Sequence, residues 1–299
     1  MRYGFVGLGN LGGHLSENLR KAGFDVTCTD LDESLAERQV AAGARWVSDA
    51  RTVAEASDVV ITCLPSPKAT RAVLEAMLPA MHPGETWIEM STLGREEVRA
   101  LAALAAEREV TTLEAPVTGG VHLAARGEIT VLVGGDPVLA ERHRPAFQAM
   151  GGKVIYLGEL GQASVVKVIT NMLAFIHLAA CGEGLMLAKR GGVDLGLAWE
   201  AIAASSGTSF VHETEGQLIL NGSYDVAFTM DLALKDLGFA MGFAEEFGVP
   251  AELAAQMQRL FERAKAAYGG DAQSPMVVKL LEDQVGVDLR APGFPARLE

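Results

Sequence analysis

The feature of this chain that most constrains its fold is a glycine-rich segment near its start. Gly7-Leu8-Gly9-Asn10-Leu11-Gly12 follows the apolar run Tyr3 to Val6 and precedes a helix-like stretch that ends near Gly23. In a G-x-G-x-x-G segment between a strand and a helix, the first glycine permits a tight turn and the second lets backbone approach a diphosphate. The third lets the helix pack close to the strand. We therefore expect Gly7, Gly9, Asn10, Leu11 and Gly12 to bind a dinucleotide.

A second strand and an acid complete this pattern. Asp25 to Thr29 is predicted to be a strand, and Asp30 follows it about 20 residues after the glycines, where a carboxylate accepts hydrogen bonds from the adenosine ribose. A carboxylate here repels a 2′-phosphate, and Leu31 stands where an arginine would hold one. The expected cofactor is therefore NAD rather than NADP, with Asp30 and Leu31 in its site.

Length and composition indicate a two-domain protein and leave small metabolites open as its partners. The chain has 299 residues, of which 49% are hydrophobic, and a net charge of −13 without a strong basic cluster. This charge disfavours nucleic acid and anionic membranes as partners. The chain enters a strand without a signal-peptide pattern, so we expect a cytoplasmic protein.

The first half alternates short apolar runs with helical stretches, which is typical of βαβ units and a largely parallel sheet. The predicted strands are residues 3–6, 26–29, 59–63, 86–90, 112–115, 129–133 and 154–156. Beyond Gly161 helix-forming residues dominate. The predicted fold is a Rossmann-type, doubly wound α/β domain over residues 1–161, followed by an all-α substrate and oligomerisation domain over residues 162–299.

The second domain is predicted to begin with one long helix from Gln162 to about Arg190. Its centre is apolar nearly all round, so other helices or a second subunit should bury it. Lys167 and Glu183 interrupt the apolar run, which favours a buried helix over a membrane span. We therefore expect a homo-oligomer, a dimer or a tetramer.

No metal site is expected. Cys28, Cys63 and Cys181 are scattered without a C-x-x-C motif, which is typical of reduced thiols. The six histidines also lack metal-ligand spacing.

Lys167 is the strongest candidate for proton transfer. A nicotinamide site needs a titratable group that takes or returns the hydroxyl proton, and no tyrosine here has the Tyr-x-x-x-Lys spacing of short-chain reductases. Lys167 lies among valines and an isoleucine, where burial would lower its pKa, and Asn171 follows one turn later on the same helix face. The alternative is that Lys167 extends from the helix end into solvent.

A glycine-framed loop follows a predicted strand at residues 114–120. The Thr118 hydroxyl and the backbone N–H groups of Gly119 and Gly120 are suited to hold a substrate carboxylate, although such segments are also ordinary turns. His122 and Arg126 follow, and either is a candidate for a second anionic group on a larger substrate. The alternative for both is a solvated turn.

The order of these motifs resembles the β-hydroxyacid dehydrogenase family, which contains 3-hydroxyisobutyrate dehydrogenase and semialdehyde reductases. The resemblance covers nearly the whole chain. It rests on the segment from Gly7 to Gly23, Leu64-Pro65, Ser91-Thr92, Ala115 to Gly120, Gly161 through Lys167 to Asn171, Glu183, and Phe228 followed by Lys235-Asp236-Leu237.

The resemblance implies that Lys167 is the catalytic acid and base and that Asn171 orients the substrate. It also implies that Thr118, Gly119 and Gly120 bind the substrate carboxylate. Thr92 and Lys235 then flank the nicotinamide, and Leu64 and Pro65 line the adenosine end. Departures occur in the substrate region, where Thr118 replaces the usual serine and Thr170 replaces an asparagine.

The sequence thus predicts an NAD-dependent oxidoreductase that interconverts a small 3-hydroxy acid and its semialdehyde. One alternative is oxidative decarboxylation of a sugar acid, as in 6-phosphogluconate dehydrogenase, although that enzyme has a much larger helical domain. Another is a non-catalytic dinucleotide-binding sensor, which would not need Lys167, Asn171 and the Thr118 loop together. The substrate itself is not identified by the sequence.

Overall fold

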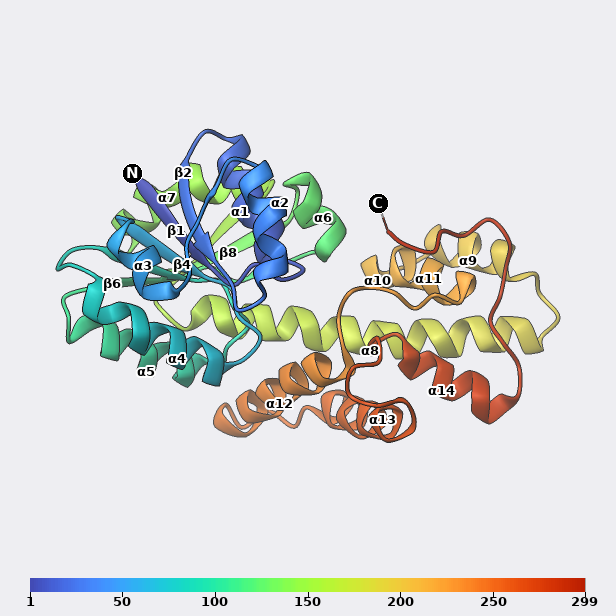
Figure 1. The fold of residues 1–299 in the computed structure, drawn as a ribbon. Helices are drawn as coiled ribbons and strands as arrows, with labels where there is room; N and C mark the ends of the chain where they lie inside the picture. The colour runs from blue at the N-terminus through green and yellow to red at the C-terminus, as the bar shows by residue number, and fades with distance from the viewer. Residues whose placement is uncertain (299) are drawn as a thin grey trace. The chain divides into compact units, whose positions relative to one another are not determined.

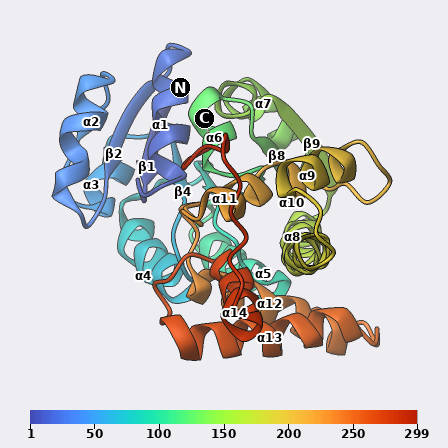
Figure 2. The same cartoon turned by 90° about the vertical axis from the view of Figure 1, so that its right-hand side faces the viewer.

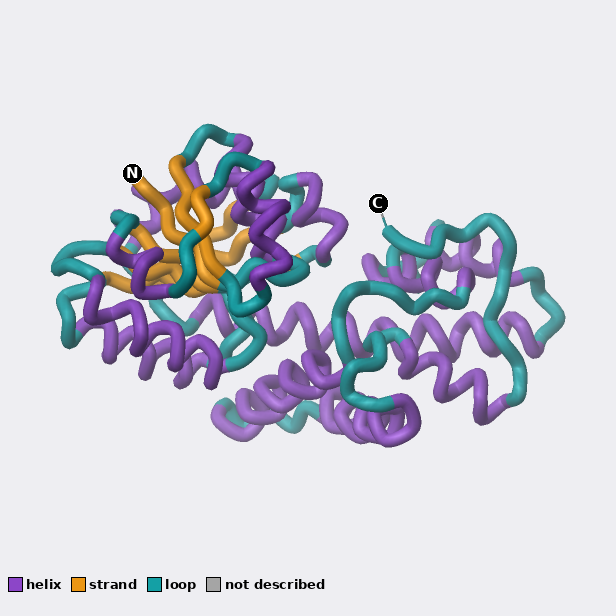
Figure 3. Tube along the Cα trace, viewed as in Figure 1, coloured by secondary structure: helices purple, strands orange, loops and turns teal. Residues whose placement is uncertain are grey.

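The computed structural model describes residues 1–298, which form two compact units by their contacts, residues 1–167 and residues 168–298 (Figure 1). All named strands lie in the first unit, and the second is built from helices (Figure 3). This is the Rossmann-type α/β domain followed by an all-α domain that the sequence predicts.

The first unit is built on one sheet. Its strands are β1 (Arg2–Val6), β2 (Asp25–Thr29), β3 (Arg45–Trp46), β4 (Val59–Thr62), β5 (Thr86–Glu89), β6 (Thr111–Glu114), β7 (Val117–Thr118), β8 (Thr130–Gly135) and β9 (Lys153–Gly158). The order is β3-β2-β1-β4-β5-β6-β8-β7, with β9 also paired to β8. The pairs from β3 to β6 are parallel, whereas β8 runs antiparallel to β6 and β7.

Helices cover both faces of this sheet (Figure 2). They are α1 (Gly12–Lys21), α2 (Ala36–Ala41), α3 (Ala50–Glu55), α4 (Pro67–Met77), α5 (Arg95–Ala106), α6 (Val121–Arg126) and α7 (Pro137–Met150). Successive strand residues point to opposite faces. Phe5 therefore joins the core beneath α1 and α7, and Val6 joins the core beneath α3, α4 and α5.

The second unit packs along most of the long helix α8 (Gln162–Arg190), which Figure 2 views nearly along its axis. The other helices are α9 (Leu195–Ala203), α10 (Phe210–Glu213), α11 (Glu215–Asn221), α12 (Met230–Glu246), α13 (Glu252–Tyr268) and α14 (Met276–Val285). Phe175, Leu185 and Phe261 lie in their common core. The long helix has the predicted bounds.

Helix α8 is more exposed than its apolar sequence suggests. By length and composition alone it could cross a membrane, since its most apolar 18-residue window has a mean hydropathy of 1.7, yet only 33% of that window is buried within the chain. Ile169 and Leu173, one turn apart, are 41% and 42% exposed. The prediction that this helix is buried therefore holds, within the chain, for only part of its surface.

Candidate active site

The three glycines between β1 and α1 differ in what surrounds them. A Cβ on Gly7 would lie 2.4 Å from the Cys63 carbonyl oxygen, and a Cβ on Gly12 would lie 2.0 Å from the Gly7 carbonyl oxygen. A Cβ on Gly9 would have no protein atom within 4 Å. The protein's own packing therefore requires glycine at positions 7 and 12, whereas the space beside Gly9 is not filled by any protein atom.

The N-terminus of α1 suits an anion. Leu11 occupies the N-cap and makes no side-chain cap hydrogen bond, and the first turn holds no acidic residue. The first N–H groups of a helix lack partners within it, and the helix dipole favours negative charge there. Together with the open side of Gly9, this end of α1 fits a dinucleotide diphosphate.

Asp30 lies at the end of β2 beside the glycine loop. Its Oδ2 accepts a hydrogen bond from the backbone N–H of Leu8 at 2.6 Å, and its Oδ1 accepts one from the N–H of Asp32 at 3.0 Å. Leu31 is fully exposed. The Asp30 carboxylate is therefore held against the glycine loop, and the Leu31 side chain next to it is exposed rather than packed.

A buried hydrogen-bond network joins the ends of β4 and β5. The Ser91 hydroxyl accepts from the backbone N–H of Leu64 at 2.8 Å, and the N–H of Ser91 donates to Glu89 at 2.6 Å. Glu89 is 1% exposed and also accepts from the Thr62 hydroxyl. This network fixes the backbone on which Leu64, Pro65 and Thr92 lie.

The predicted carboxylate loop includes the short strand β7, in which Thr118 pairs with Thr130 of β8. Gly119 and Gly120 both have positive φ, at 132° and 91°, which favours glycine. His122 lies beside the loop, because a Cβ on Gly120 would be 3.1 Å from its ring. Burial and then the charge of Arg126 lower the pKa of His122, which favours the neutral form of its ring.

Lys167 is buried in α8, with 8% of the residue exposed. It does not extend into solvent as an isolated surface lysine would. Burial, followed by the negative charge of Glu89, raises the pKa of the nearby Cys63 thiol to about 12, while the charge of Lys167 acts in the opposite direction. Lys167 and Glu89 are thus both close enough to act electrostatically on one thiol.

In the second unit, one buried carboxylate holds both predicted site residues. Asn171 Nδ2 donates to Asp236 Oδ2 at 2.6 Å, and Lys235 Nζ lies 3.1 Å from Asp236 Oδ1. Asp236 is 1% exposed. The Lys235 ammonium also lies 5.4 Å from the centre of the Phe239 ring. Sequence reasoning did not assign Asp236 to the site, because nothing local marks its contact with Asn171.

The predicted site residues are distributed over both units. Asn171 and Lys235 belong to the second unit, and the first unit carries all the others, including Lys167 at its last position. His177, which the apolar sequence around it suggests is a core histidine, is exposed on α8. That interpretation was wrong, because α8 is not covered on that side.

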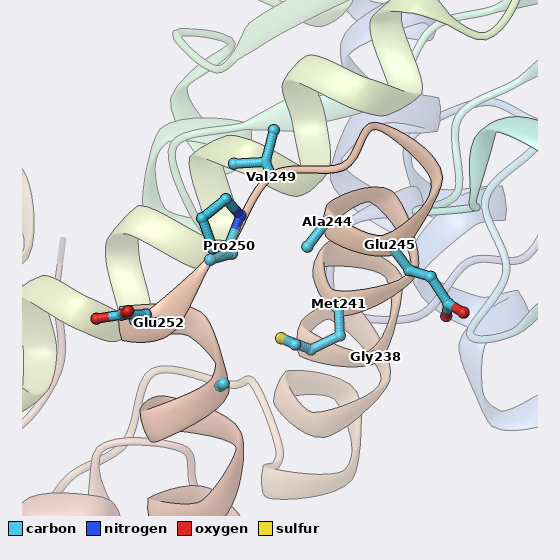
Figure 4. Close-up of a pocket in the computed structure, with 10 residues that line it drawn as sticks. Gly238, Met241, Ala244, Glu245, Val249, Pro250 and Glu252 are labelled. Atoms are coloured by element: carbon cyan, nitrogen blue, oxygen red, sulfur yellow. The ribbon is translucent and has the colours of Figure 1, made fainter.

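Two hollows of the described chain are lined by none of these residues. One is lined by α12, α13 and the segment between them, and it includes Met241 of α12 and Val249 and Pro250 of that segment (Figure 4). Glu245 and Glu252 are the titratable residues among those that line it, and none of the predicted site residues is among them. Within residues 1–298, no group of three or more His, Cys, Asp or Glu side chains is arranged to hold a metal ion.

Comparisons with known proteins match both units. Residues 2–158 match the family model described as the NAD binding domain of 6-phosphogluconate dehydrogenase. Residues 161–281 match the model described as NAD-binding of NADP-dependent 3-hydroxyisobutyrate dehydrogenase.

Whole-chain relatives agree with these domains. The chain is 31% identical to 2-(hydroxymethyl)glutarate dehydrogenase of Eubacterium barkeri, over 97% of each chain. It is 32% identical to L-threonate dehydrogenase of Cupriavidus necator, over 93% of this chain and 95% of that one. The solved structure of Mycobacterium tuberculosis 3-hydroxyisobutyrate dehydrogenase with L-serine has a TM-score of 0.84 and 30% identity, over 94% of this chain and 99% of that one. The chain therefore belongs to the β-hydroxyacid dehydrogenase family, oxidoreductases that bind a nicotinamide dinucleotide and act on the CH–OH group of hydroxy acids.

Proposed function

We propose that this protein is an NAD-dependent dehydrogenase that interconverts a small 3-hydroxy acid and its semialdehyde. One observation supports this most strongly: a lysine with 8% exposure, Lys167, lies one helical turn before Asn171 in a chain that also carries a dinucleotide-binding loop. A buried lysine is costly unless its charge is used or paired. Its position in this family member fits proton transfer.

The residues divide the chemistry between them. When bound, NAD accepts a hydride from the carbinol carbon, and NADH returns it in the reverse reaction. Lys167 Nζ takes the hydroxyl proton during oxidation and returns it to the carbonyl oxygen during reduction. Because an ionised carboxylate only accepts hydrogen bonds, Asp236 must face Asn171 Nδ2. The amide oxygen of Asn171 therefore faces the other way, where it orients the substrate hydroxyl or the lysine.

The substrate carboxylate is assigned to the loop after β6. The Thr118 hydroxyl and the backbone N–H groups of Gly119 and Gly120 are its hydrogen-bond donors, and the methyl group of Thr118 narrows this end of the site. His122, with its pKa below the usual range, offers a neutral hydrogen bond to a larger substrate. Arg126 already lies 2.9 Å from Glu128. This pairing favours a substrate with one carboxylate.

The cofactor is assigned to NAD. The Asp30 carboxylate is held within hydrogen-bond distance of the glycine loop and repels a 2′-phosphate, and Asp32 and Glu33 add negative charge. We assign Leu64 and Pro65 to the adenosine end and Thr92 and Lys235 to the sides of the nicotinamide. The glycine loop, including Asn10 and Leu11, holds the diphosphate.

Two alternative functions would give different experimental results. An oxidative decarboxylase of a sugar acid, suggested by the description of the first family model, would release carbon dioxide with each NADH. A non-catalytic sensor would bind NADH and turn over nothing. The buried Lys167 and the Asn171 contact favour a dehydrogenase over the sensor, since neither is needed for dinucleotide binding alone. The helical domain of this chain, smaller than that of 6-phosphogluconate dehydrogenase, favours a dehydrogenase over the decarboxylase.

NADH formation at 340 nm over a panel of 3-hydroxy acids, with NAD and NADP in parallel and carbon dioxide measured, tests the proposal. We expect one acid to give turnover with NAD and no carbon dioxide. NADH binding by fluorescence without turnover on any acid would favour the sensor instead, and stoichiometric carbon dioxide would favour the decarboxylase.

We also propose that the protein is cytoplasmic and forms a homo-oligomer through α8 and the helices beside it. Ile169 and Leu173 are exposed on α8, and Glu183 lies on the same helix at a hollow that also contains Arg259 and Arg263 of α13. A two-fold interface brings the same patch of two copies together, so that Glu183 of one copy meets these arginines of the other. Light scattering of the wild type and of Leu173→Glu tests this. A monomeric wild type at micromolar concentration would contradict it.

A further inference from the structure

Glu114, at the end of β6, is a buried carboxylate that the proposed reaction does not use. Only 1% of the residue is exposed. Its Oε1 accepts hydrogen bonds from the backbone N–H groups of Gly161 at 2.6 Å and Ala163 at 2.9 Å. Its Oε2 accepts from the N–H of Ser164 at 3.1 Å and the Ser164 hydroxyl at 2.5 Å. One side chain thus takes up the polar groups at the start of α8.

The electrostatics of this contact favour an ordered helix end. The first N–H groups of a helix have no partner within it, and a negative charge there interacts favourably with the helix dipole. Hydrogen bonds to an ionised acceptor are stronger than neutral ones. Burial raises the pKa of Glu114, whereas the hydrogen bonds from Ser164, Ala163 and Gly161 act to lower it. Both protonation and loss of this carboxyl group would therefore weaken the contact.

The surrounding backbone is shaped to admit this carboxylate. A Cβ on Gly134 of β8 would lie 2.4 Å from Glu114 Oε1. Gly161 has a φ of +97°, which directs the backbone into the turn before α8. Three segments far apart in the sequence, at the ends of β6 and β8 and the start of α8, thus meet at one side chain.

This contact joins two parts of the proposed site in the first unit, Lys167 and the Thr118 loop. Thr118 follows Glu114 by four residues, and the connecting backbone is fixed because Ala115 N–H donates to the Glu89 carbonyl oxygen and Leu132 N–H donates to that of Pro116. On the other side, Lys167 follows Ser164 by three residues in the same helix. The carboxylate therefore lies about one turn from the lysine and one short segment from the Thr118 loop.

We propose that Glu114 is a positioning residue, whose carboxylate fixes the first turn of α8 and thereby the place of Lys167 relative to the Thr118 loop. The role rests on the proposed function of Lys167. A misplacement of about 1 Å in a reacting group can cost about 100-fold in rate. Glu114 itself touches neither the substrate nor the cofactor in this account.

Two variants disturb the contact in different ways. Glu114→Gln keeps the shape of the side chain but turns one acceptor into a donor, which cannot face the N–H groups of α8. Gly134→Ala keeps the charge and pushes the carboxylate away. Glu141→Gln is the matched control, because Glu141 is an exposed glutamate of α7 paired with Arg144 at 2.6 Å.

The first readout is kcat per NADH-binding site, so that loss of folded protein does not count as loss of rate. We expect kcat to fall about 10- to 100-fold in both variants, while the NADH dissociation constant and the control variant stay near wild type. A role in stability alone would lower the number of sites and leave kcat per site unchanged, and that result would overturn the proposal.

The second readout separates this proposal from the proposed function. Amide hydrogen exchange should show faster exchange at Gly161 to Lys167 in Glu114→Gln, whether or not a substrate is known. If the wild type turns over no hydroxy acid, the proposed function fails while faster exchange still supports the fixed helix end. Unchanged exchange in this segment would overturn the positioning role directly.

Discussion

The amide nitrogen of Asn171 donates to the carboxylate of Asp236 at 2.6 Å, although the two residues are 65 positions apart in the chain. The same carboxylate lies 3.1 Å from the Lys235 ammonium. A single buried acid therefore orients an amide on α8 and pairs with an ammonium on α12. If both act on the substrate and cofactor, Asp236 is a positioning residue that touches neither of them.

Asp236→Asn tests this arrangement. The amide that replaces the carboxylate loses the charge that pairs with Lys235 and can no longer dictate the orientation of Asn171. We expect kcat/KM for the hydroxy acid to fall about 10- to 100-fold, measured by NADH formation at 340 nm.

Asp231→Asn is the matched control. It makes the same change on the same helix, but Asp231 forms an exposed ion pair with Lys265 at 2.6 Å. Exposed pairs contribute about 0–1 kcal/mol, so this variant should behave as wild type. Equal effects of the two substitutions would show that Asp236 has no special role.

The glycine loop predicts opposite outcomes for two alanine substitutions. Gly12→Ala places a Cβ 2.0 Å from the Gly7 carbonyl oxygen and should lower the melting temperature, whereas Gly9→Ala meets no protein atom within 4 Å and should not. Gly9→Ala should instead weaken NADH binding by about 10-fold or more, because the added methyl group occupies the space assigned to the diphosphate. Fluorescence titration and thermal unfolding measure both effects. Normal NADH affinity in Gly9→Ala would contradict the assignment of the diphosphate to this loop.

Cofactor preference should shift with the residues after β2. Leu31 is fully exposed, so Leu31→Arg adds a phosphate-binding cation without disturbing packing. We expect Leu31→Arg to lower the preference for NAD over NADP. The double variant Asp30→Ser with Leu31→Arg should reverse this preference. Val138→Arg, an exposed substitution on α7 with the same change in charge, should leave the preference unchanged. The ratio of kcat/KM for NAD and NADP is the measurement, and a wild type that prefers NADP would contradict the assignment.

The carboxyl group of Glu215 makes stability depend on pH. Burial raises the pKa of Glu215 from 4.5 to about 7, so the folded state binds its proton more tightly than the unfolded chain does. Its contribution to stability is therefore full below pH 4.5 and is lost as the pH rises toward 7. Glu215→Gln stays neutral throughout, and at pH 8 it should be more stable than wild type by about 1–3 kcal/mol.

Thermal unfolding between pH 5 and pH 8 measures this difference, with Glu262→Gln, an exposed substitution on α13, as the control. The gain in Glu215→Gln should increase with pH. A gain that stays constant over this range, or one shared by the control, would exclude the ionisation of Glu215 as its cause.

The fold could be predicted well because its signals are local. The apolar runs at β1, β2 and β4 are clear in the sequence, those of β1 and β4 supplying residues to two cores, and the long helix α8 was expected with the bounds it has. The two-residue strands β3 and β7 were missed, since so short a segment carries no period. A domain boundary between residues 161 and 162 stays a prediction.

The candidate site was predictable only where a motif marks it. The glycine loop and Asp30 follow a spacing set by the chemistry of dinucleotides, and Lys167 stands out as a charge in an apolar helix. Asp236 and Glu114 carry no such mark in the sequence, because their partners Asn171 and Ser164 come close only once the chain has folded. Buried carboxylates that hold other residues in place leave no local pattern.

The most direct test of the central claim is the turnover of Lys167→Met. Methionine fills a similar space in α8 but cannot take or donate a proton. With a hydroxy acid that the wild type oxidises, we expect kcat to fall by about 10²- to 10⁴-fold while fluorescence shows unchanged NADH binding. Turnover near the wild-type rate in this variant would contradict the account, because another group would then have to move the proton.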